Sequence, residues 1–437
     1  MIKFVSIYKK NQDVKYSFKE AVLNPLGPDN ELLIPEIIHK IDHEFISKID
    51  KYNLQEIFLY ISNIFLDGSI PYYDLKKIIN NSINFPLNLK KLDKNLFCFE
   101  LFHGPTLAFK DFGARFLAKI ISYLNNDCIT TIVSATSGDT GSAVADGFYQ
   151  LKNTQVFLLY PSNKISFIQE KQLTTLNENI HAIEVDGTFD DCQAMLKGIL
   201  KDKQLTNKYN ITTANSINIA RILPQVCYYF YAYSLIKDKS KDIVISIPSG
   251  NYGNLTAGIM AYKMGLPIKK FIASSNINDV VPIYLRTGNF IPKKSQLTIS
   301  NAMDVGNPSN FIRIIDLFNY NLDEIKKVIN GYSFTDLETI KAIKFVYKKY
   351  KYILDPHSSI GFLGLEKYNN IGNYNINNIF FSTAHYSKFK DLIDNYLNIK
   401  IEIPERLLKC INKEKKSIKI DTNIASFINA IKKISII

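Results

Sequence analysis

The sequence has no tryptophan, few cysteines, and no uninterrupted run of apolar residues long enough to cross a membrane as a helix. Its N-terminal stretch, MIKFVSIYKKNQ, also lacks the apolar core of a secretory signal peptide. We therefore expect a cytoplasmic protein without a membrane partner.

The cysteines are five in number and widely scattered, and none stands in a C-x-x-C pair. This pattern excludes a disulfide framework and a zinc site of the usual spacing. We expect no metal, and buried, unreactive thiols at Cys98, Cys128, Cys192, Cys227 and Cys410.

Acidic residues are fewer than basic ones, with 41 Asp and Glu against 53 Lys and Arg, which gives a net charge of +12. Such an excess can indicate binding to nucleic acid. Here the lysines are spread along the whole chain, and no basic stripe with interleaved aromatic residues is visible. We therefore expect no nucleic-acid partner.

Apolar residues make up 46% of the 437 residues and charged residues 22%, which is typical of a soluble globular chain of about two or three domains. Residues 1–90 show helical periodicity around Leu54 to Ile64, interrupted by prolines, without regular alternation of strands and helices. We predict a mostly helical N-terminal domain over residues 1–90 and a catalytic domain over residues 91–437.

After residue 97, short apolar segments are followed by glycine-rich turns and amphipathic stretches. Predicted strands are Ile129–Ala135, Gln155–Tyr160, His181–Val185 and Asp242–Ile247, and predicted helices include Ser142–Leu151 and Leu255–Gly265. This alternation predicts an α/β fold with parallel sheets, in which ligands bind at the carboxyl ends of the strands.

Lys110 stands among Leu107, Ala108, Phe109 and Phe112 in the stretch LFHGPTLAFKDFGAR. A lysine among apolar and small residues can be partly desolvated, which lowers the pKa of its amine and makes the amine a usable nucleophile or base. The same stretch could instead be an ordinary turn before a helix, with the lysine reaching into solvent.

Two glycine-rich turns follow predicted strands and precede predicted helices. In PSGNYGN, residues Pro248 to Asn254, small residues let backbone N–H groups converge on an anion such as a phosphate. In TSGDTG, Ser137, Thr140 and free N–H groups could bind a carboxylate, while Asp139 could meet a polar ring substituent. Each turn also has a plain structural reading, as a tight turn or a capped helix.

An amine, a phosphate-binding turn and a carboxylate-binding turn are together what pyridoxal 5′-phosphate requires, since its aldehyde needs a lysine and its phosphate an anion-binding loop. The PSGNYGN turn has neither the dinucleotide fingerprint G-x-G-x-x-G nor the G-K-[ST] of a nucleotide phosphate loop. We therefore predict pyridoxal 5′-phosphate as the cofactor.

Several segments resemble, in order and spacing, the motifs of bacterial threonine synthases: HGPTLAFKDFGARF, ATSGDTGSAVA, ANSINIARILPQ, PSGNYGNLTAG, NAMDVGNPSN and STAHYSKFKD. The resemblance extends over nearly the whole chain. It implies a fold-type-II pyridoxal phosphate enzyme, related to the tryptophan synthase β-subunit. It also implies two parallel-sheet subdomains, the smaller at roughly residues 112–225, preceded by a threonine-synthase N-terminal domain.

The resemblance implies roles for single residues. Lys110 matches the Schiff-base lysine, Asp139 lies where relatives place an Asn or Asp near the cofactor 3′-oxygen, and Thr383 matches the threonine that hydrogen-bonds the pyridine nitrogen. A neutral hydroxyl leaves that nitrogen largely unprotonated, which favours elimination or replacement over transamination. The implied phosphate loop comprises Ser249, Gly250, Asn251, Tyr252, Gly253 and Asn254.

Two residues depart from the family pattern. Ser382 and Tyr386 stand where the related motif usually has Gly and Pro around T-A-H, and their bulk could shift Thr383. Because the remaining motifs are intact, we interpret both as tolerated changes.

The substrate that the resemblance implies is O-phospho-L-homoserine, whose phosphate dianion requires cationic groups beyond the cofactor loop. The candidate cations are Arg115, Lys164 and Arg221, with Ser216 and Asn218 as polar support. Each of the cations could instead be a structural ion-pair partner.

The activity implied by the resemblance is that of a threonine synthase, which forms L-threonine and phosphate from O-phospho-L-homoserine and water. We expect it to act as a monomer. Two alternatives stay open, a related lyase that releases 2-oxobutanoate and a catalytically inactive binding protein. The intact Lys110 weighs against the inactive protein.

Overall fold

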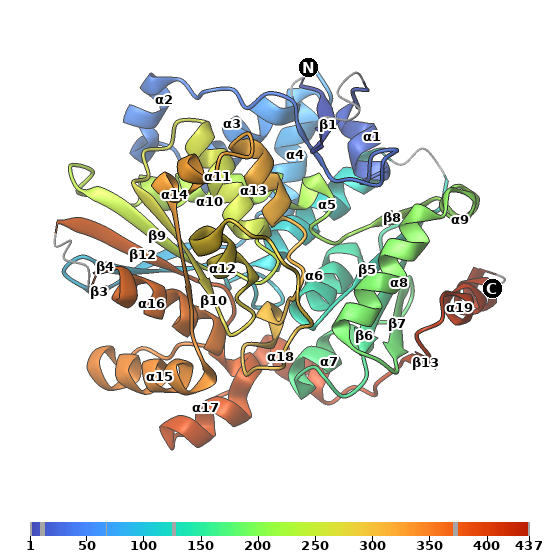
Figure 1. Cartoon of the computed structure of the whole chain (residues 1–437). Coiled ribbons are helices and arrows are strands. Elements are labelled where there is room, and N and C mark those ends of the chain that lie inside the picture. The colour runs from blue at the N-terminus through green and yellow to red at the C-terminus, as the bar shows by residue number, and fades with distance from the viewer. Residues whose placement is uncertain (1, 9–13, 67, 125–127, 370–374, 436–437) are drawn as a thin grey trace.

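The computed structural model describes residues 1–437 except 1, 9–13, 67, 125–127, 370–374 and 436–437. The described chain forms an N-terminal helical segment and two sheets of mainly parallel strands, each covered by helices on both faces (Figure 1). None of the helices in this described part is long and apolar enough to span a bilayer.

The N-terminal segment is mostly helical, as predicted. Its helices are α1 (Phe18–Leu23), α2 (His43–Ser47), α3 (Leu54–Leu66) and α4 (Tyr72–Ser82), with the 3-10 turn η2 (Ile49–Lys51). Strands β1 (Phe4–Ser6) and β2 (Leu33–Pro35) pair antiparallel, which the sequence did not predict. The apolar face of α3, with Ile57, Ile61 and Phe65 fully buried, packs against α10 (Leu223–Ser234) of the larger sheet.

The larger sheet has the strand order β11-β10-β9-β12-β4-β3. Its strands are β3 (Asn88–Asp93), β4 (Leu96–Glu100), β9 (Asp242–Pro248), β10 (Lys270–Ser275), β11 (Ile329–Ser333) and β12 (Ile376–Ser382). All neighbouring strands are parallel except the β3–β4 hairpin. Ile245 and Val244 of β9 belong to the cores on opposite faces, which is why this strand reads as a continuous apolar run.

Helices cover both faces of the larger sheet. They are α10, α11 (Gly253–Lys263), α12 (Val280–Thr287), α13 (Phe311–Leu317), α14 (Leu322–Val328), α15 (Asp336–Tyr350) and α16 (Pro356–Asn369). Helix α16 packs across β9, β10 and β12, while α10 and α11 pack together on the side of the N-terminal segment (Figure 1).

The smaller sheet has the order β13-β7-β6-β5-β8, and all its neighbouring strands are parallel. Its strands are β5 (Thr130–Ala135), β6 (Thr154–Pro161), β7 (Ile180–Val185), β8 (Ile211–Thr213) and β13 (Ile418–Ile420). The strands predicted at residues 129–135, 155–160 and 181–185 correspond to β5, β6 and β7. Strand β13 comes from the end of the chain, outside the range 112–225 that the resemblance implies.

Helices around the smaller sheet are α5 (Lys110–Leu124), α6 (Asp139–Phe148), α7 (Phe167–Thr174), α8 (Phe189–Lys201), α9 (Lys203–Tyr209) and α19 (Ile424–Ser435). The other elements are η3 (Ile219–Arg221), η4 (Asn301–Met303), η5 (Tyr386–Phe389), α17 (Lys390–Leu397) and α18 (Glu405–Ile411). Neighbouring residues of β5 point to opposite faces of this sheet. Ile132 belongs to the apolar core that includes residues of α6, and Val133 belongs to the core that includes residues of α8. The smaller sheet is therefore also buried on both faces.

Three local predictions were wrong. Helix α6 begins at Asp139 instead of Ser142, because Gly138, within the TSGDTG turn, takes a φ of 126° and caps the helix directly before Asp139. Helix α11 begins at Gly253 instead of Leu255, after Tyr252 in the left-handed region at a φ of 61°. Cys128 is exposed in the connection before β5, and Cys410 is half-buried near the end of α18, whereas the other cysteines are buried.

Candidate active site

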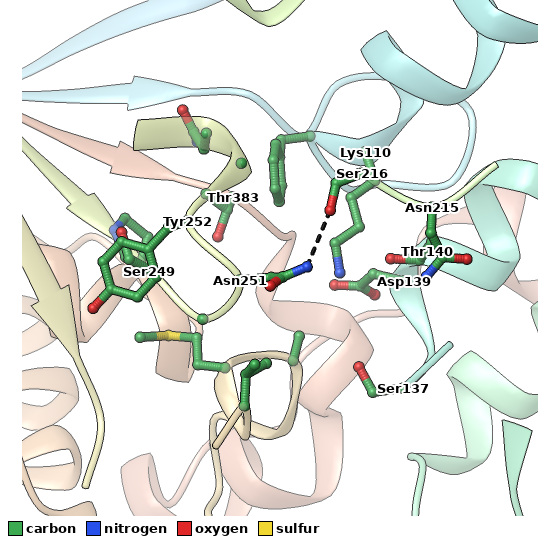
Figure 2. A pocket seen from close by; sticks show the side chains of 18 of the residues that line it. Lys110, Ser137, Asp139, Thr140, Asn215, Ser216, Ser249, Asn251, Tyr252 and Thr383 are labelled. Carbon is green, nitrogen blue, oxygen red and sulfur yellow. Dashed lines mark hydrogen bonds between the residues drawn. The ribbon is translucent and has the colours of Figure 1, made fainter. Parts of the chain in front are cut away.

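The site lies where the carboxyl ends of strands from both sheets meet. Strand β5 leads into the TSGDTG turn, β9 into the PSGNYGN turn and β12 into Thr383, and together they surround one cavity (Figure 2). Its walls include many of the predicted site residues: Lys110, Ser137, Asp139, Thr140, Ser216, Arg221, Ser249, Gly250, Asn251, Tyr252, Gly253, Asn254 and Thr383.

Backbone pairing between two distant segments sets the position of Lys110. The Phe109 N–H donates to the Thr383 carbonyl at 2.8 Å, and the His385 N–H donates to the Leu107 carbonyl at 3.0 Å. Leu107 takes a φ of 58°, an uncommon conformation for a leucine. Lys110 then opens α5, so the pairing of residues 107–109 with residues 383–385 brings the lysine and Thr383 to the same cavity.

The Lys110 amine is suited to nucleophilic or basic chemistry. Burial lowers its pKa to about 8, with Arg221 and Lys388 also lowering it and Asp139 opposing them. Within the described residues no hydrogen bond or ion pair is recorded for the Lys110 side chain. In Figure 2 the amine points into the cavity beside the Asp139 carboxylate. About a tenth of this amine is therefore neutral at pH 7, far more than for a lysine with the ordinary pKa of 10.5.

Asp139 is held as an anion by a second lysine. Lys388 places its Nζ 2.6 Å from Asp139 Oδ1, with both side chains almost fully buried, and also donates to the Thr106 carbonyl at 3.1 Å. The Gln169 amide donates to the same Asp139 oxygen at 2.9 Å. Burial alone would raise the pKa of Asp139, but Lys388, Lys110 and His357 hold it well below its usual range.

The PSGNYGN turn presents donors without partners. No acceptor is recorded, within the described structure, for the backbone N–H groups of residues 250–254, which precede or begin α11. The Asn254 Nδ2 is a buried donor that also has no partner. A Cβ atom on Gly250 would lie 2.7 Å from the Met303 Cα, so only glycine allows this close approach. Such a cluster of unpaired donors at a helix N-terminus matches an anion.

Ser216 extends this cluster. Its Oγ accepts hydrogen bonds from Asn251 Nδ2 at 3.1 Å, drawn as the dashed line in Figure 2, and from Asn310 Nδ2 at 2.8 Å. Because two donors occupy the oxygen, the hydroxyl proton is free to donate into the cavity.

The departure at Ser382 is accommodated behind the site. Ser382 Oγ lies 2.8 Å from Ser358 Oγ, which also bonds to the Asp355 carboxylate and accepts the Thr383 N–H at 3.3 Å. The Thr383 hydroxyl points into the cavity (Figure 2). Ser382 thus joins a hydrogen-bond network that supports the Thr383 backbone.

Some predicted substrate residues lie outside this cavity. Arg115 donates to Asp146 at 3.1 Å and to the Ser82 carbonyl at 3.0 Å, so its guanidinium connects α5 with α6 and α4. Asn218 is fully buried and donates to the Val22 carbonyl at 2.9 Å. Both side chains are used in structural contacts, which argues against their assignment to substrate binding.

Lys164 lies in an adjoining cavity that shares Ser137 and Phe189 with the first. Its Nζ donates to the Gly187 carbonyl at 2.9 Å, and Lys294 lines the same space. The two cavities together can hold a ligand with an amino-acid end and an anionic end.

Sequence reasoning missed Lys388, Lys294 and His357. Lys388 belongs to the recognised segment STAHYSKFKD, five residues after Thr383, and this fixed offset could have indicated it. His357 lines the cavity with its Nδ1 bound to Asp355 at 2.9 Å, and the D-x-H spacing was a possible signal. Lys294 stands in the long segment between α12 and η4, where no pattern indicates it.

Comparisons with known proteins agree along the whole chain. The family of pyridoxal-phosphate dependent enzymes matches residues 83–381, and the threonine synthase N terminus matches residues 3–83. Threonine synthase from Haemophilus influenzae is 42% identical over 404 residues, which cover 92% of this chain and 93% of that protein.

Solved structures agree with the sequence relatives. Threonine synthase from Escherichia coli superposes with a TM-score of 0.93 at 35% identity, covering 99% of both chains. The pyridoxal-phosphate-bound threonine synthase from Brucella melitensis gives a TM-score of 0.91 at 29% identity, again covering 99% of each. The fold class predicted from the sequence is confirmed by these superpositions.

Proposed function

Because the chain belongs to the threonine synthase family of pyridoxal-phosphate-dependent enzymes, we propose that it converts O-phospho-L-homoserine and water into L-threonine and phosphate. The observation that supports this most directly is the free Lys110 amine, with a pKa of about 8, facing a cluster of unpaired anion-binding donors across one cavity.

The residues of the cavity fit pyridoxal phosphate. The unpaired N–H groups of residues 250–254, the orphaned Asn254 amide and the Ser216 hydroxyl suit its phosphate, and the Lys110 amine suits its aldehyde. We assign the Thr383 hydroxyl as the hydrogen-bond partner of the pyridine nitrogen, and Asp139 as the residue near the ring 3′-oxygen. When bound, this cofactor acts as an electron sink that acidifies the proton on the substrate Cα.

Lys110 is the proton carrier in this proposal. Its amine would remove the proton from the substrate Cα, and then one from Cβ as phosphate leaves Cγ. A base with a pKa of about 8 is close to the optimum for proton transfer near neutral pH. Cγ takes up a proton to become the methyl group, water gives its hydroxyl to Cβ, and a proton returns to Cα, which completes threonine.

Asp139 and Thr383 set the electrostatics around this lysine. The Asp139 carboxylate, kept ionised by Lys388, faces the amine and stabilises positive charge that develops there. The Thr383 hydroxyl is neutral, so it orients the ring without fixing a proton on the nitrogen. This arrangement favours elimination and replacement over transamination.

The substrate is assigned to both cavities. Ser137, Thr140 and the start of α6 suit its carboxylate, because two hydroxyls line the cavity there at a helix N-terminus. The N–H groups of Gly138 and Gly141 donate to the Thr136 hydroxyl, and no acceptor within the described structure is found for those of Asp139 and Thr140. Arg221, in the cavity that Lys110 lines, and Lys164 with Lys294, in the adjoining cavity, supply the cations for its phosphate. Arg115 and Asn218 are no longer part of this assignment.

We further propose that the protein is a monomer and that it acts in the cytoplasm. Its partner in this proposal is a small-molecule substrate and not a nucleic acid. The domain division at residue 90 likewise stays a prediction. The helical segment ends with α4 at Ser82 and the larger sheet begins with β3 at Asn88, which supports a boundary between these two elements, a few residues before residue 90, which lies within β3.

The test is to incubate the purified, cofactor-loaded chain with O-phospho-L-homoserine and to measure phosphate, threonine and 2-oxobutanoate in the same samples. Equal amounts of phosphate and threonine are expected. Phosphate with 2-oxobutanoate alone would assign the chain to a lyase instead. Cofactor binding without any turnover would indicate a binding protein.

A further inference from the structure

Arg313 on α13 is completely buried, and uncharged groups bind it on all sides. Its Nε donates to the Leu33 carbonyl at 3.0 Å, and its Nη2 donates to the Ile217 carbonyl at 2.7 Å. Its Nη1 donates to the Ser216 carbonyl at 2.9 Å and to Asn310 Oδ1 at 2.5 Å. These bonds connect helix α13 with two distant parts of the chain, strand β2 near the N-terminus and the segment that follows β8.

The guanidinium charge lacks a counter-ion among the described residues. None of its recorded partners is a carboxylate, and burial alone lowers the pKa of Arg313 to about 9. Two other buried cations near the site have a carboxylate close by. Lys388 pairs with Asp139, and the charge of Asp111 raises the pKa of Arg221. A buried cation without an opposite charge is costly, so such a group indicates a missing anion.

The anion-binding turn lies in front of this charge. Asn310 accepts from Arg313 and donates to Ser216 Oγ, which in turn accepts from Asn251. A Cβ atom on Gly253 would lie 3.5 Å from Asn310 Nδ2 and 3.4 Å from Ser216 Cβ. The Arg313–Asn310–Ser216 chain therefore lies directly behind the first residue of α11, where N–H groups have no partner.

We propose that Arg313 is a positioning residue for the cofactor phosphate, which supplies its missing negative charge across the Asn310–Ser216 hydrogen-bond chain. The inference rests on the proposed placement of that phosphate at residues 250–254. Arg313 does not touch the phosphate. It orients the Asn310 and Ser216 donors, and its charge adds to the positive potential of the turn, in a buried setting where water screens little.

Pyridoxal lacks the phosphate of pyridoxal phosphate, so the two ligands separate this electrostatic role from a merely structural one. Affinities for both are measured by absorbance titration of the full-length chain freed of cofactor, in wild type and in Arg313→Gln, Arg313→Lys and Asn310→Asp variants. The Gln variant removes the charge. The Asp variant keeps Arg313 and its carbonyl contacts and supplies a carboxylate partner at nearly unchanged shape, while it loses the Nδ2 donor to Ser216 Oγ.

We expect Arg313→Gln and Asn310→Asp to weaken pyridoxal phosphate binding by about tenfold or more while changing pyridoxal binding by less than about twofold. Arg313→Lys retains the charge and should keep the affinity ratio of the two ligands near the wild-type value. Equal weakening of both ligands in the Gln and Asp variants would overturn the inference. If the Gln variant does not fold, equal weakening of both ligands in the Asp variant still overturns the inference, and a selective loss there supports it only together with a wild-type ligand ratio in Arg313→Lys.

Variants of Gly253 distinguish failure of this inference from failure of the proposed site. Gly253→Asp brings a like charge to the turn and should selectively weaken pyridoxal phosphate. Gly253→Ala, whose methyl fits at ordinary contact distances, should not. If Gly253→Asp leaves the ligand ratio unchanged, the phosphate does not bind at this turn. If it changes the ratio and the Arg313 and Asn310 variants do not, only the role of Arg313 is refuted.

Discussion

Replacing Lys388 by methionine should destabilise the protein, because it leaves the Asp139 carboxylate buried without its closest cation. The pair is 2.6 Å apart, and the exposed fractions of the two side chains are 0% and 4%. Removing one partner of a buried pair costs about 3–5 kcal/mol. The Gln169 amide and the Lys110 amine stay near Asp139, so we expect a loss at the lower end, about 3 kcal/mol.

The assay is urea unfolding followed by circular dichroism, on the full chain without added cofactor, with midpoint and slope compared between variants. Lys390→Met is the matched control, because Lys390 pairs with Asp394 on the same stretch of chain where both side chains are partly exposed. It should cost no more than about 1 kcal/mol. The double variant Lys388→Met, Asp139→Asn removes both charges and should recover much of the lost stability.

The loss should also depend on pH. In the wild type the pKa of Asp139 lies below its ordinary value of 3.8, so its stabilisation is present above that value and is lost only as the pH falls further. In Lys388→Met, burial should raise the pKa of Asp139. As the pH falls, Asp139 then takes up a proton, and the cost of its unpaired buried charge disappears. The difference between the two proteins should therefore shrink from pH 7 towards about pH 4. A loss below about 1 kcal/mol at pH 7, or one that does not change with pH, would refute this reasoning.

Other predictions concern single residues. Borohydride reduction of the cofactor-loaded protein should attach the cofactor to the peptide containing Lys110; attachment at another lysine would contradict the assignment. In the cofactor-free chain, amine-reactive labelling of Lys110 should rise with pH around a midpoint of about 8, well below the ordinary lysine value of 10.5, because only the neutral amine reacts. Thr383→Asp should raise the pKa of the pyridine nitrogen and increase the pyridoxamine form of the cofactor relative to threonine. Thr383→Val should lose only the orienting hydrogen bond, about 1 kcal/mol, and an aspartate variant that partitions like wild type would show that this side chain does not meet the ring. Arg115→Met should lower the free energy of unfolding by about 1–3 kcal/mol while kcat/KM stays within about twofold, and a large loss of kcat/KM with unchanged stability would return this residue to the substrate site.

The sequence by itself determined the local features of this protein. Period and composition indicated β5, β6, β7 and β9, since strands buried on both faces read as short apolar runs. The glycine-rich turns at the carboxyl ends of β5 and β9 could also be predicted, because the backbone conformation of a turn depends mainly on residues adjacent in the chain. Lys110 could be chosen because its apolar neighbours are adjacent in the chain. The order of the recognised motifs supplied the family and the fold class.

Only the tertiary structure decided which charged groups serve the site. Arg115 and Arg221 were equal candidates by sequence, yet Arg115 binds Asp146 and Arg221 lines the cavity. The ion pair of Asp139 with Lys388 and the unbalanced charge of Arg313 were likewise invisible. The pairing and desolvation of a charge depend on which elements pack around it. Elements distant in the chain supply those neighbours, so sequence spacing carries no information about them.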